Sequence, residues 1–117
     1  MNSAASIPSP LQPDKLRRDL DLSRERMARL VDVSAKTIER WEGAQALPSS
    51  TRVRIQLAQI QQMRDLGLLV YTLEGFRLFL RTPLPDLGGQ TPLQMIEQGK
   101  IEAVIGALAA DYEGLGF

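Results

Sequence analysis

Residues 22–41 read LSRERMARLVDVSAKTIERW, and this stretch decides the fold of the chain. Apolar side chains recur at helical spacing on both sides of residues 31–33, which predicts two short amphipathic helices joined by a tight turn. Ser23 and Ser34 stand where N-caps belong, because a serine hydroxyl accepts a hydrogen bond from an unpaired backbone N–H at a helix start. Asp32 can adopt the left-handed backbone conformation that such a turn requires.

The two predicted helices each have an apolar face and a polar face. We expect the inward face to consist of the apolar side chains of both helices, namely Met27, Ala28, Leu30, Val31, Ile38 and Trp41. The outward face of the second helix carries short or cationic side chains: Ala35, Lys36, Thr37 and Arg40. This arrangement is typical of a helix-turn-helix whose second helix enters a DNA major groove. Paired amphipathic helices also occur in bundles that never contact DNA.

These residues resemble the Xre/Cro-type helix-turn-helix of phage and bacterial repressors. That family's small residue matches Ala28, its turn residue falls at Asp32, and its buried aliphatic residue and Trp match Ile38 and Trp41. The family usually has Gly at the turn and often Gln where Arg24 stands, so Arg24 should bind phosphate more strongly and read bases less selectively. With Thr51 at the start of the next helix, the expected DNA-binding residues are Ser23, Arg24, Ser34, Ala35, Lys36, Thr37, Arg40 and Thr51.

The composition excludes several classes of protein. The 117 residues contain no Cys and no His, which removes disulfides, thiolate zinc sites and Ser–His or Cys–His catalysis. We therefore expect no enzyme, no metal and no cofactor. No stretch is apolar for long enough to span a membrane, and the N-terminus lacks the features of a signal peptide. These observations favour the cytoplasm, without membrane contact, and the resemblance to bacterial repressors implies a bacterial one.

The net charge of zero averages two unlike halves. Residues 14–64 carry eleven Lys and Arg against seven Asp and Glu, a balance of +4. Residues 65–117 carry three against seven, a balance of −4. The positive excess thus lies around the predicted helix-turn-helix, which favours phosphate contacts by the first half, with the acidic half kept away from the duplex.

The first half is predicted to continue as helices after an N-terminal arm. Residues 1–13 are mainly Ser, Ala and Pro and should form a flexible arm, and a first helix should cover residues 13–19, with its Lys and Arg solvated or near DNA. A helix beginning near Ser50 should end at Gly67, and residues 68–71 should start another helix or form a buried connector. We expect this helix to bury Val53, Leu57, Ala58, Ile60 and Met63.

The second half is predicted to be a small helical bundle, which makes the chain all-α. Thr72 should cap a helix over residues 73–81, and residues 82–89 should be irregular, because they contain two prolines and two glycines. Thr91-Pro92-Leu93-Gln94 is a capping box, so a helix should start there and end at Gly99. A last helix over residues 100–113 should complete a second domain, residues 67–117, after a DNA-binding domain of residues 14–66. The buried positions expected here are Phe76, Phe79, Leu80, Ile101, Val104, Ile105 and Leu108.

Residues 83–92, PLPDLGGQTP, carry a second resemblance. They match the recurring P-x-x-x-L-G-G-x-x-P core of the C-terminal toxin-binding domain of the MbcA/ParS/Xre antitoxins, and a helix follows in both. The resemblance implies a type II toxin–antitoxin pair. Its toxin would have the RES fold and degrade NAD⁺, and the antitoxin would cover the toxin's pocket, often with its own C-terminal segment, and repress the shared operon.

The last four residues are the candidate toxin contacts. Gly114 and Gly116 permit unusual backbone angles, and Leu115 and Phe117 offer apolar anchors beside the terminal carboxylate. The alternative is a frayed terminus that folds back on its own bundle.

Two functions follow from these resemblances. The first is an antitoxin that neutralises a RES-domain toxin and, as a homodimer, binds operator DNA, since one such module makes too few DNA contacts for tight binding. The second is a simple Xre-family repressor whose second half serves only dimerisation or ligand sensing.

Overall fold

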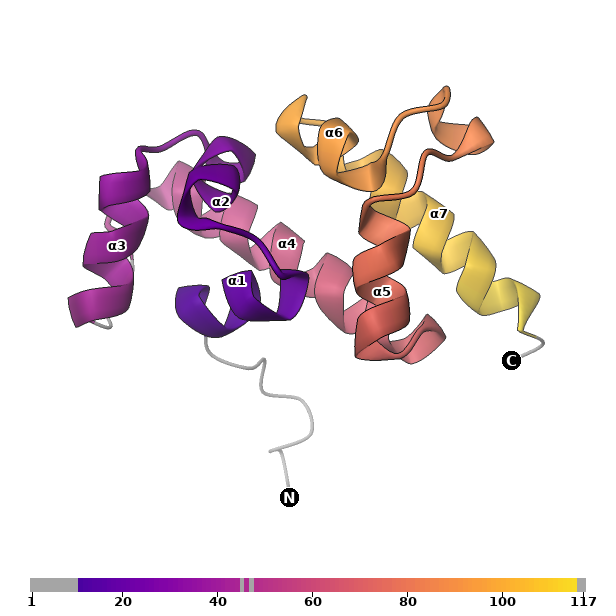
Figure 1. Ribbon diagram of the computed structural model, residues 1–117, viewed down its shortest axis with the longest axis horizontal. Helices are drawn as coiled ribbons and strands as arrows, with labels where there is room; N and C mark the ends of the chain where they lie inside the picture. The colour runs from indigo at the N-terminus through magenta and orange to yellow at the C-terminus, as the bar shows by residue number, and fades with distance from the viewer. Residues whose placement is uncertain (1–10, 45, 47, 116–117) are drawn as a thin grey trace, which may run out of the picture.

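The structure, a computed structural model, describes residues 11–44, 46 and 48–115, and these residues form helices joined by short loops (Figure 1). The predicted all-α class is confirmed. Within the described part of the chain, an isolated bridge between Leu84 and Gln90 is the only strand-like pairing. The elements in chain order are α1 (Pro13–Leu20), α2 (Arg24–Val31), α3 (Ala35–Ala44), α4 (Thr51–Val70), α5 (Leu73–Leu80), the 3₁₀ helix η2 (Pro85–Leu87), α6 (Pro92–Glu97) and α7 (Ile101–Gly114).

Local sequence explains where the first three helices begin and end. Pro13 is the first residue of α1, a position that needs no backbone donor. The hydroxyl of Ser23 accepts a hydrogen bond from the backbone N–H of Arg26 (3.1 Å) at the start of α2. Asp21 and Asp32, with φ of 56° and 55°, adopt the left-handed conformation and end α1 and α2. The predicted cap at Ser23 and the predicted turn at Asp32 are both confirmed.

The N-terminal arm is shorter than expected. Leu11 is half-buried and packs against the core, although it falls within the predicted arm, whereas α1 begins at Pro13 as predicted. Residues 1–10 of that arm lie outside the described residues.

The prediction that Gly67 ends the fourth helix is wrong. Helix α4 passes through Gly67 and ends only at Val70, so it runs through the expected boundary between the two halves (Figure 1). Gly67 is buried, and a Cβ built on it would overlap the ring of Phe76 in α5. Gly67 is therefore the point at which α4 and α5 approach each other closely, and it does not cap the helix.

The second half packs around the distal part of α4 and matches most of the predicted helix boundaries. Thr72 caps α5 through a hydrogen bond from the backbone N–H of Gly75 (3.0 Å). Thr91 and Gln94 form the predicted capping box of α6. The loop before it is more regular than expected, because it contains η2 and the bridge between Leu84 and Gln90.

The buried apolar side chains of both halves form one continuous cluster. Helix α1 packs against α5, α2 packs against α6, and α4 packs against α7, so the halves share a core. Two predicted buried positions differ, because Ala58 is exposed and Ile105 is only half-buried. Leu68 and Leu69, predicted to start a helix or to form a buried connector, are exposed residues of α4. No helix among the described residues is both long enough and apolar enough to cross a membrane.

Candidate functional site

The turn between α2 and α3 sets the direction in which α3 leaves the core. The backbone N–H groups of Asp32 and Val33 both donate to the carbonyl of Ala28, which closes the end of α2. The hydroxyl of Ser34 accepts a hydrogen bond from the backbone N–H of Thr37 (3.1 Å) at the start of α3, as predicted for an N-cap. Both ends of the turn are therefore fixed by hydrogen bonds, and the two helices pack directly against each other.

The inner face of α3 is buried and its outer face is cationic. Ile38 and Trp41 are 1% and 6% exposed, as predicted. Lys36 and Arg40 are exposed, and neither forms a hydrogen bond or ion pair with any other described residue. The side chains of Lys36 and Arg40 are therefore available to a partner with negative charge.

The other two residues expected on the outward face are less free. Ala35 is half-buried and packs against the core, so the expectation that it would not bury is wrong. Thr37 is also half-buried, and its Oγ1 lies 2.9 Å from Oγ of Ser34 in a hydrogen bond. Both residues sit in the first turn of α3, on either side of the exposed Lys36. The projecting surface is thus centred on Lys36 and Arg40.

A nearly buried carboxylate joins the first three helices. Glu42 of α3, whose side chain is 7% exposed, accepts two hydrogen bonds from Arg17 of α1, from Nε to Oε2 (2.6 Å) and from Nη2 to Oε1 (3.0 Å). Arg24 of α2 donates from Nε to Oε1 of the same carboxylate (3.0 Å). The network ties α1, α2 and α3 into one rigid unit.

The charges of this network determine the pKa values of its members. Burial alone would raise the pKa of Glu42, but hydrogen bonds from Arg17 and Arg24 outweigh this and hold its pKa below the ordinary value. The hydrogen bond to Glu42 in turn raises the pKa of Arg17, against the opposing effect of burial. Arg17 is therefore structural and not solvated as expected. Arg24, predicted to bind phosphate, already pairs with Glu42, although its side chain is 45% exposed.

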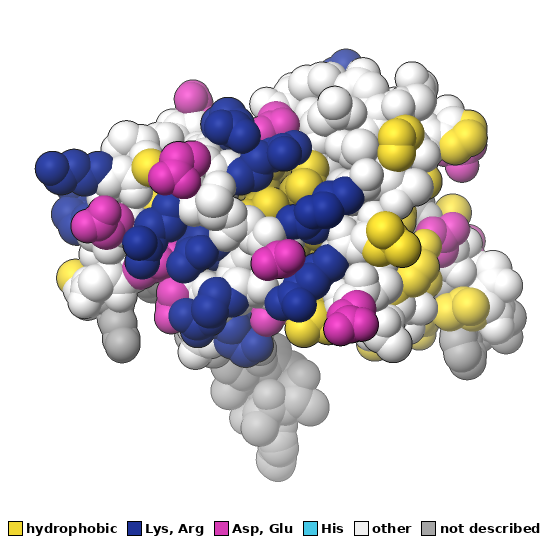
Figure 2. Space-filling model, viewed as in Figure 1, with side chains coloured by type: hydrophobic (Ala, Val, Ile, Leu, Met, Phe, Trp, Pro, Cys, Tyr) yellow, Lys and Arg dark blue, Asp and Glu magenta, His cyan; other side chains and the backbone are white. Residues whose placement is uncertain are grey.

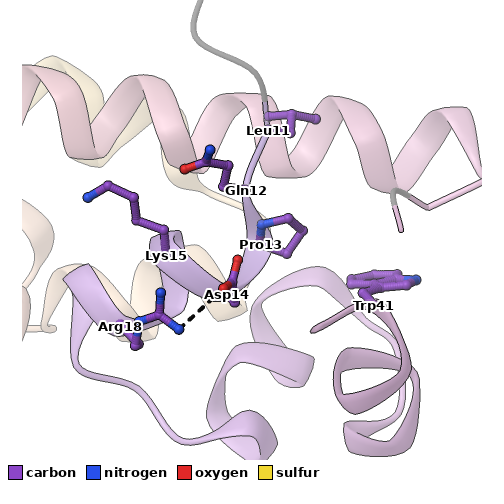
Figure 3. Close-up of a pocket in the computed structure, with 7 residues that line it drawn as sticks. All are labelled: Leu11, Gln12, Pro13, Asp14, Lys15, Arg18 and Trp41. Carbon is purple, nitrogen blue, oxygen red and sulfur yellow. Dashed lines mark hydrogen bonds and ion pairs between the residues drawn. The ribbon is translucent and has the colours of Figure 1, made fainter. Parts of the chain in front are cut away.

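The hollow between the start of α1 and α3 is an unsuitable ligand site. Its volume is about 480 Å³, and its lining residues are Leu11, Gln12, Pro13, Asp14, Lys15, Arg18 and Trp41 (Figure 3). Arg18 pairs with Asp14 (3.2 Å) and Lys15 pairs with Asp19 (3.2 Å). Both cations of the hollow are thus already neutralised by carboxylates of the same helix.

Thr51, the remaining predicted DNA contact, is exposed as the first residue of α4. The neighbouring Arg52 is also exposed, and its Nη1 donates to Oε1 of Gln56 (2.7 Å). Ser50 caps the helix by accepting a hydrogen bond from the backbone N–H of Val53 (3.4 Å). Thr51 and Arg52 are therefore accessible at the positive end of the longest helix.

The charges of the two halves are not kept apart. Glu97 of α6 forms ion pairs with Arg26 (3.0 Å) and Arg29 (3.1 Å) of α2. Figure 2 shows Lys and Arg side chains spread over α1, α2 and α3 and continuing toward α5. The basic surface thus extends into the half whose net charge is negative.

The predicted toxin-contact segment is only partly described. Gly114 is the last residue of α7, and Leu115 is 50% exposed. Gly116 and Phe117 lie outside the described residues.

Sequence reasoning missed several large apolar side chains that are exposed in the second half. Leu69, at the end of α4, is 63% exposed, and Leu73 and Leu78 of α5 are 37% and 69% exposed. Hydrophobic side chains are also visible on the α5 and α7 side of Figure 2. The signal was present in the sequence, because α5 contains more large apolar residues than one buried face can accommodate. We call Leu69, Leu73 and Leu78 the exposed leucines.

Comparison with known proteins identifies the class. Residues 69–114 match the model of the antitoxin Xre/MbcA/ParS C-terminal toxin-binding domain. The second half is therefore a toxin-binding domain of the Xre/MbcA/ParS antitoxins. The resemblance carried by residues 83–92 is confirmed. An antitoxin of this kind acts by binding, so the prediction that the chain is not an enzyme is also confirmed.

The fold is similar to that of a solved antitoxin complex. A chain in the crystal structure of the M. tuberculosis MbcT–MbcA toxin–antitoxin complex superimposes with a TM-score of 0.71, and the match covers 97% of each chain at 20% sequence identity. This likeness extends over the first half, which the family model does not cover. No curated protein matches the chain.

Proposed function

We propose that this antitoxin neutralises a RES-domain, NAD⁺-degrading toxin by covering its active site, and that as a homodimer it represses its own operon by binding operator DNA. The observation that carries the DNA-binding part is the outer face of α3. Lys36 and Arg40 project there without ion-pair partners among the described residues, while Ile38 and Trp41 anchor the opposite face in the core.

The geometry of α2 and α3 supports entry of α3 into a major groove. A helix in the groove contacts base edges with side chains of its first turns, and the preceding helix lies across the backbone. Lys36 and Arg40 would approach the bases, and Thr51 and Arg52 at the start of α4 would approach a phosphate. Ser23 and Ser34 would contribute through their backbone, since their hydroxyls already cap helices.

The toxin-binding part rests on the family domain and on apolar surface. The exposed leucines and Leu115 all lie in or next to residues 69–114, and large apolar side chains left exposed in a toxin-binding domain are candidates for contact with the partner. We propose that these leucines contact the body of the toxin, and that Gly114–Phe117 enter its pocket. The RES fold of the toxin follows from the family resemblance.

The proposal is tested by two measurements on the full-length chain. Pull-down from the native bacterium, followed by mass identification, should recover a RES-domain protein encoded beside this gene. A duplex from immediately upstream of the gene should be shifted by the purified chain in a gel. Recovery of no toxin, with DNA binding intact, would instead support the simple Xre-family repressor, and no shift would reject operator binding.

A further inference from the structure

Two arginines of the toxin-binding domain reach the end of α1 in the first half. Arg77 lies in α5, and Arg81, four residues later, is the residue that follows the last turn of α5, so both are placed at the same end of the helix. Each donates to two consecutive backbone carbonyls. The bonds run from Nη2 and Nε of Arg77 to the carbonyls of Arg18 (2.8 Å) and Asp19 (3.0 Å), and from Nη2 of Arg81 to those of Leu20 (3.0 Å) and Asp21 (2.6 Å).

The carbonyls of Asp19 and Leu20 are the last two of α1, and that of Arg18 also accepts a hydrogen bond from the backbone N–H of Asp21 (3.0 Å). The last four carbonyls of an α-helix lack intrahelical partners, and positive charge near them is favourable because of the helix dipole. Helix α1 has only eight residues, which is too short to be stable without tertiary contacts. The guanidinium groups of Arg77 and Arg81 thus form a C-terminal cap that is supplied by the other half of the chain.

The capping helix is itself firmly held. Phe76 and Leu80 of α5 are fully buried, and Phe79 is 6% exposed. Arg81 also donates from Nη1 to the carbonyl of Arg77 (2.9 Å), which fixes its side chain along α5. The cap therefore moves only if α5 moves.

Helix α1 in turn determines the position of α3. The two helices are in contact, and Arg17 of α1 forms two hydrogen bonds with Glu42 of α3. A shift of the α1 end would carry Arg17 with it and loosen the only side-chain network that joins α1, α2 and α3 within the described part of the chain. A continuous path of contacts thus leads from α5 through α1 to the helix that carries Lys36 and Arg40.

From this path we propose that Arg77 and Arg81 are positioning residues for DNA binding, which hold α1 and through it α3 in the binding geometry. The inference rests on the proposed contact between α3 and DNA. It assigns to two residues of the toxin-binding domain a role in the other activity of the protein. It also implies that the first half, separated from α5, would lose both its cap and its operator affinity.

The test compares full-length variants on the duplex from upstream of the gene. Arg77→Met with Arg81→Met should lower DNA affinity on the order of fivefold to tenfold, while the slope of log affinity against log salt stays as in the wild type, because no phosphate contact is lost. A direct phosphate contact would instead change that slope by about 0.9. Hydrogen exchange at residues 35–44 should become faster in the double variant and stay unchanged in Arg40→Ala. Arg81→Lys should retain more affinity than Arg81→Met.

Matched controls separate this inference from the proposed function. Lys100→Met removes one exposed cation of the second half that makes no such contact among the described residues, and it should bind DNA as the wild type does. Arg40→Ala must weaken binding if α3 contacts DNA at all, and wild-type affinity of that variant would reject the proposed function. Reduced affinity of Arg40→Ala, together with wild-type affinity of the double variant, would overturn the positioning role alone. A changed salt slope in the double variant would also overturn it. If the double variant does not fold, the single variant Arg81→Met decides by the same criteria.

Discussion

The backbone of Gly67 in α4 lies directly against the ring of Phe76 in α5, with no room between them for a Cβ. Phe76 is fully buried, so its ring cannot swing aside into solvent. This close approach sets the distance between the two helices and thereby the position of Arg77, the next residue along the chain. The contact links the shared helix α4 to the helix that caps α1.

Gly67→Ala should destabilise the protein even though alanine favours helices. The added methyl group would force Phe76 or α5 to shift, at a cost of about 1–3 kcal/mol in the free energy of unfolding, which exceeds the gain of about 1 kcal/mol in helix propensity. Denaturant unfolding of both proteins measures the difference. Gly106→Ala in α7 is the matched control: nothing lies within 4 Å of its added Cβ, so it should be neutral or stabilising. A Gly67→Ala protein as stable as Gly106→Ala would contradict the close packing.

The network around Glu42 should make stability depend on pH. The pKa of Glu42 is lower in the folded chain than in the unfolded chain, so its contribution to stability is present at neutral pH and is lost as the pH falls below about 5. Glu42→Gln should lower the free energy of unfolding at pH 7 by about 1–3 kcal/mol and should flatten its decline in acid. Thermal melts of both proteins between pH 7 and pH 3 provide the measurement. Equal dependence on pH in the two proteins would show that Glu42 does not titrate in this way.

The exposed leucines should matter for toxin binding but not for folding. Leu69→Gln with Leu78→Gln should weaken binding of the neighbouring gene's toxin by at least roughly tenfold, since buried apolar anchors dominate interface energetics. The melting temperature should change little, because both side chains are more than half exposed. Ile55→Gln is the control, because Ile55 is 55% exposed but lies outside residues 69–114. Calorimetric titration of each variant with the toxin measures the affinity. Equal affinities of the double leucine variant and Ile55→Gln would show that the exposed leucines do not contact the toxin.

Removal of residues 114–117 should separate inhibition from association. If the tail enters the toxin's pocket, the truncated antitoxin should still bind the toxin through the exposed leucines but should no longer block NAD⁺ consumption. DNA binding should be unaffected, because the C-terminal end of α7 lies at the other end of the molecule from α3 (Figure 1). An assay of NAD⁺ loss with purified toxin tests this. Full inhibition by the truncated chain would remove the tail from the mechanism.

Features encoded by neighbouring residues could be predicted from the sequence. The caps at Ser23, Ser34 and Thr72 and the capping box at Thr91 each involve residues three apart, so their spacing is visible in the chain itself. The left-handed turn at Asp32 was recognised in the same way. The Leu-Gly-Gly motif identified the second half because it is a family signature.

Features that depend on distant residues could not be predicted. The sequence around Gly67 indicates a helix end, because nothing in its neighbourhood shows that Phe76 packs against it. The sequence predicts Arg17 and Arg24 to be solvated or DNA-binding cations, because it does not show that Glu42, many residues later, pairs with both. The contacts of Arg77 and Arg81 could not be predicted for the same reason, since their partners are backbone carbonyls about 60 positions earlier.

The central claim is that the outer face of α3 binds operator DNA while a separate surface binds the toxin. The most direct measurement is the affinity of Lys36→Ala with Arg40→Ala for the upstream duplex and for the toxin, side by side with the wild type. We predict that the double variant loses at least roughly tenfold in DNA affinity and inhibits the toxin as the wild type does. Unchanged DNA affinity would contradict the account.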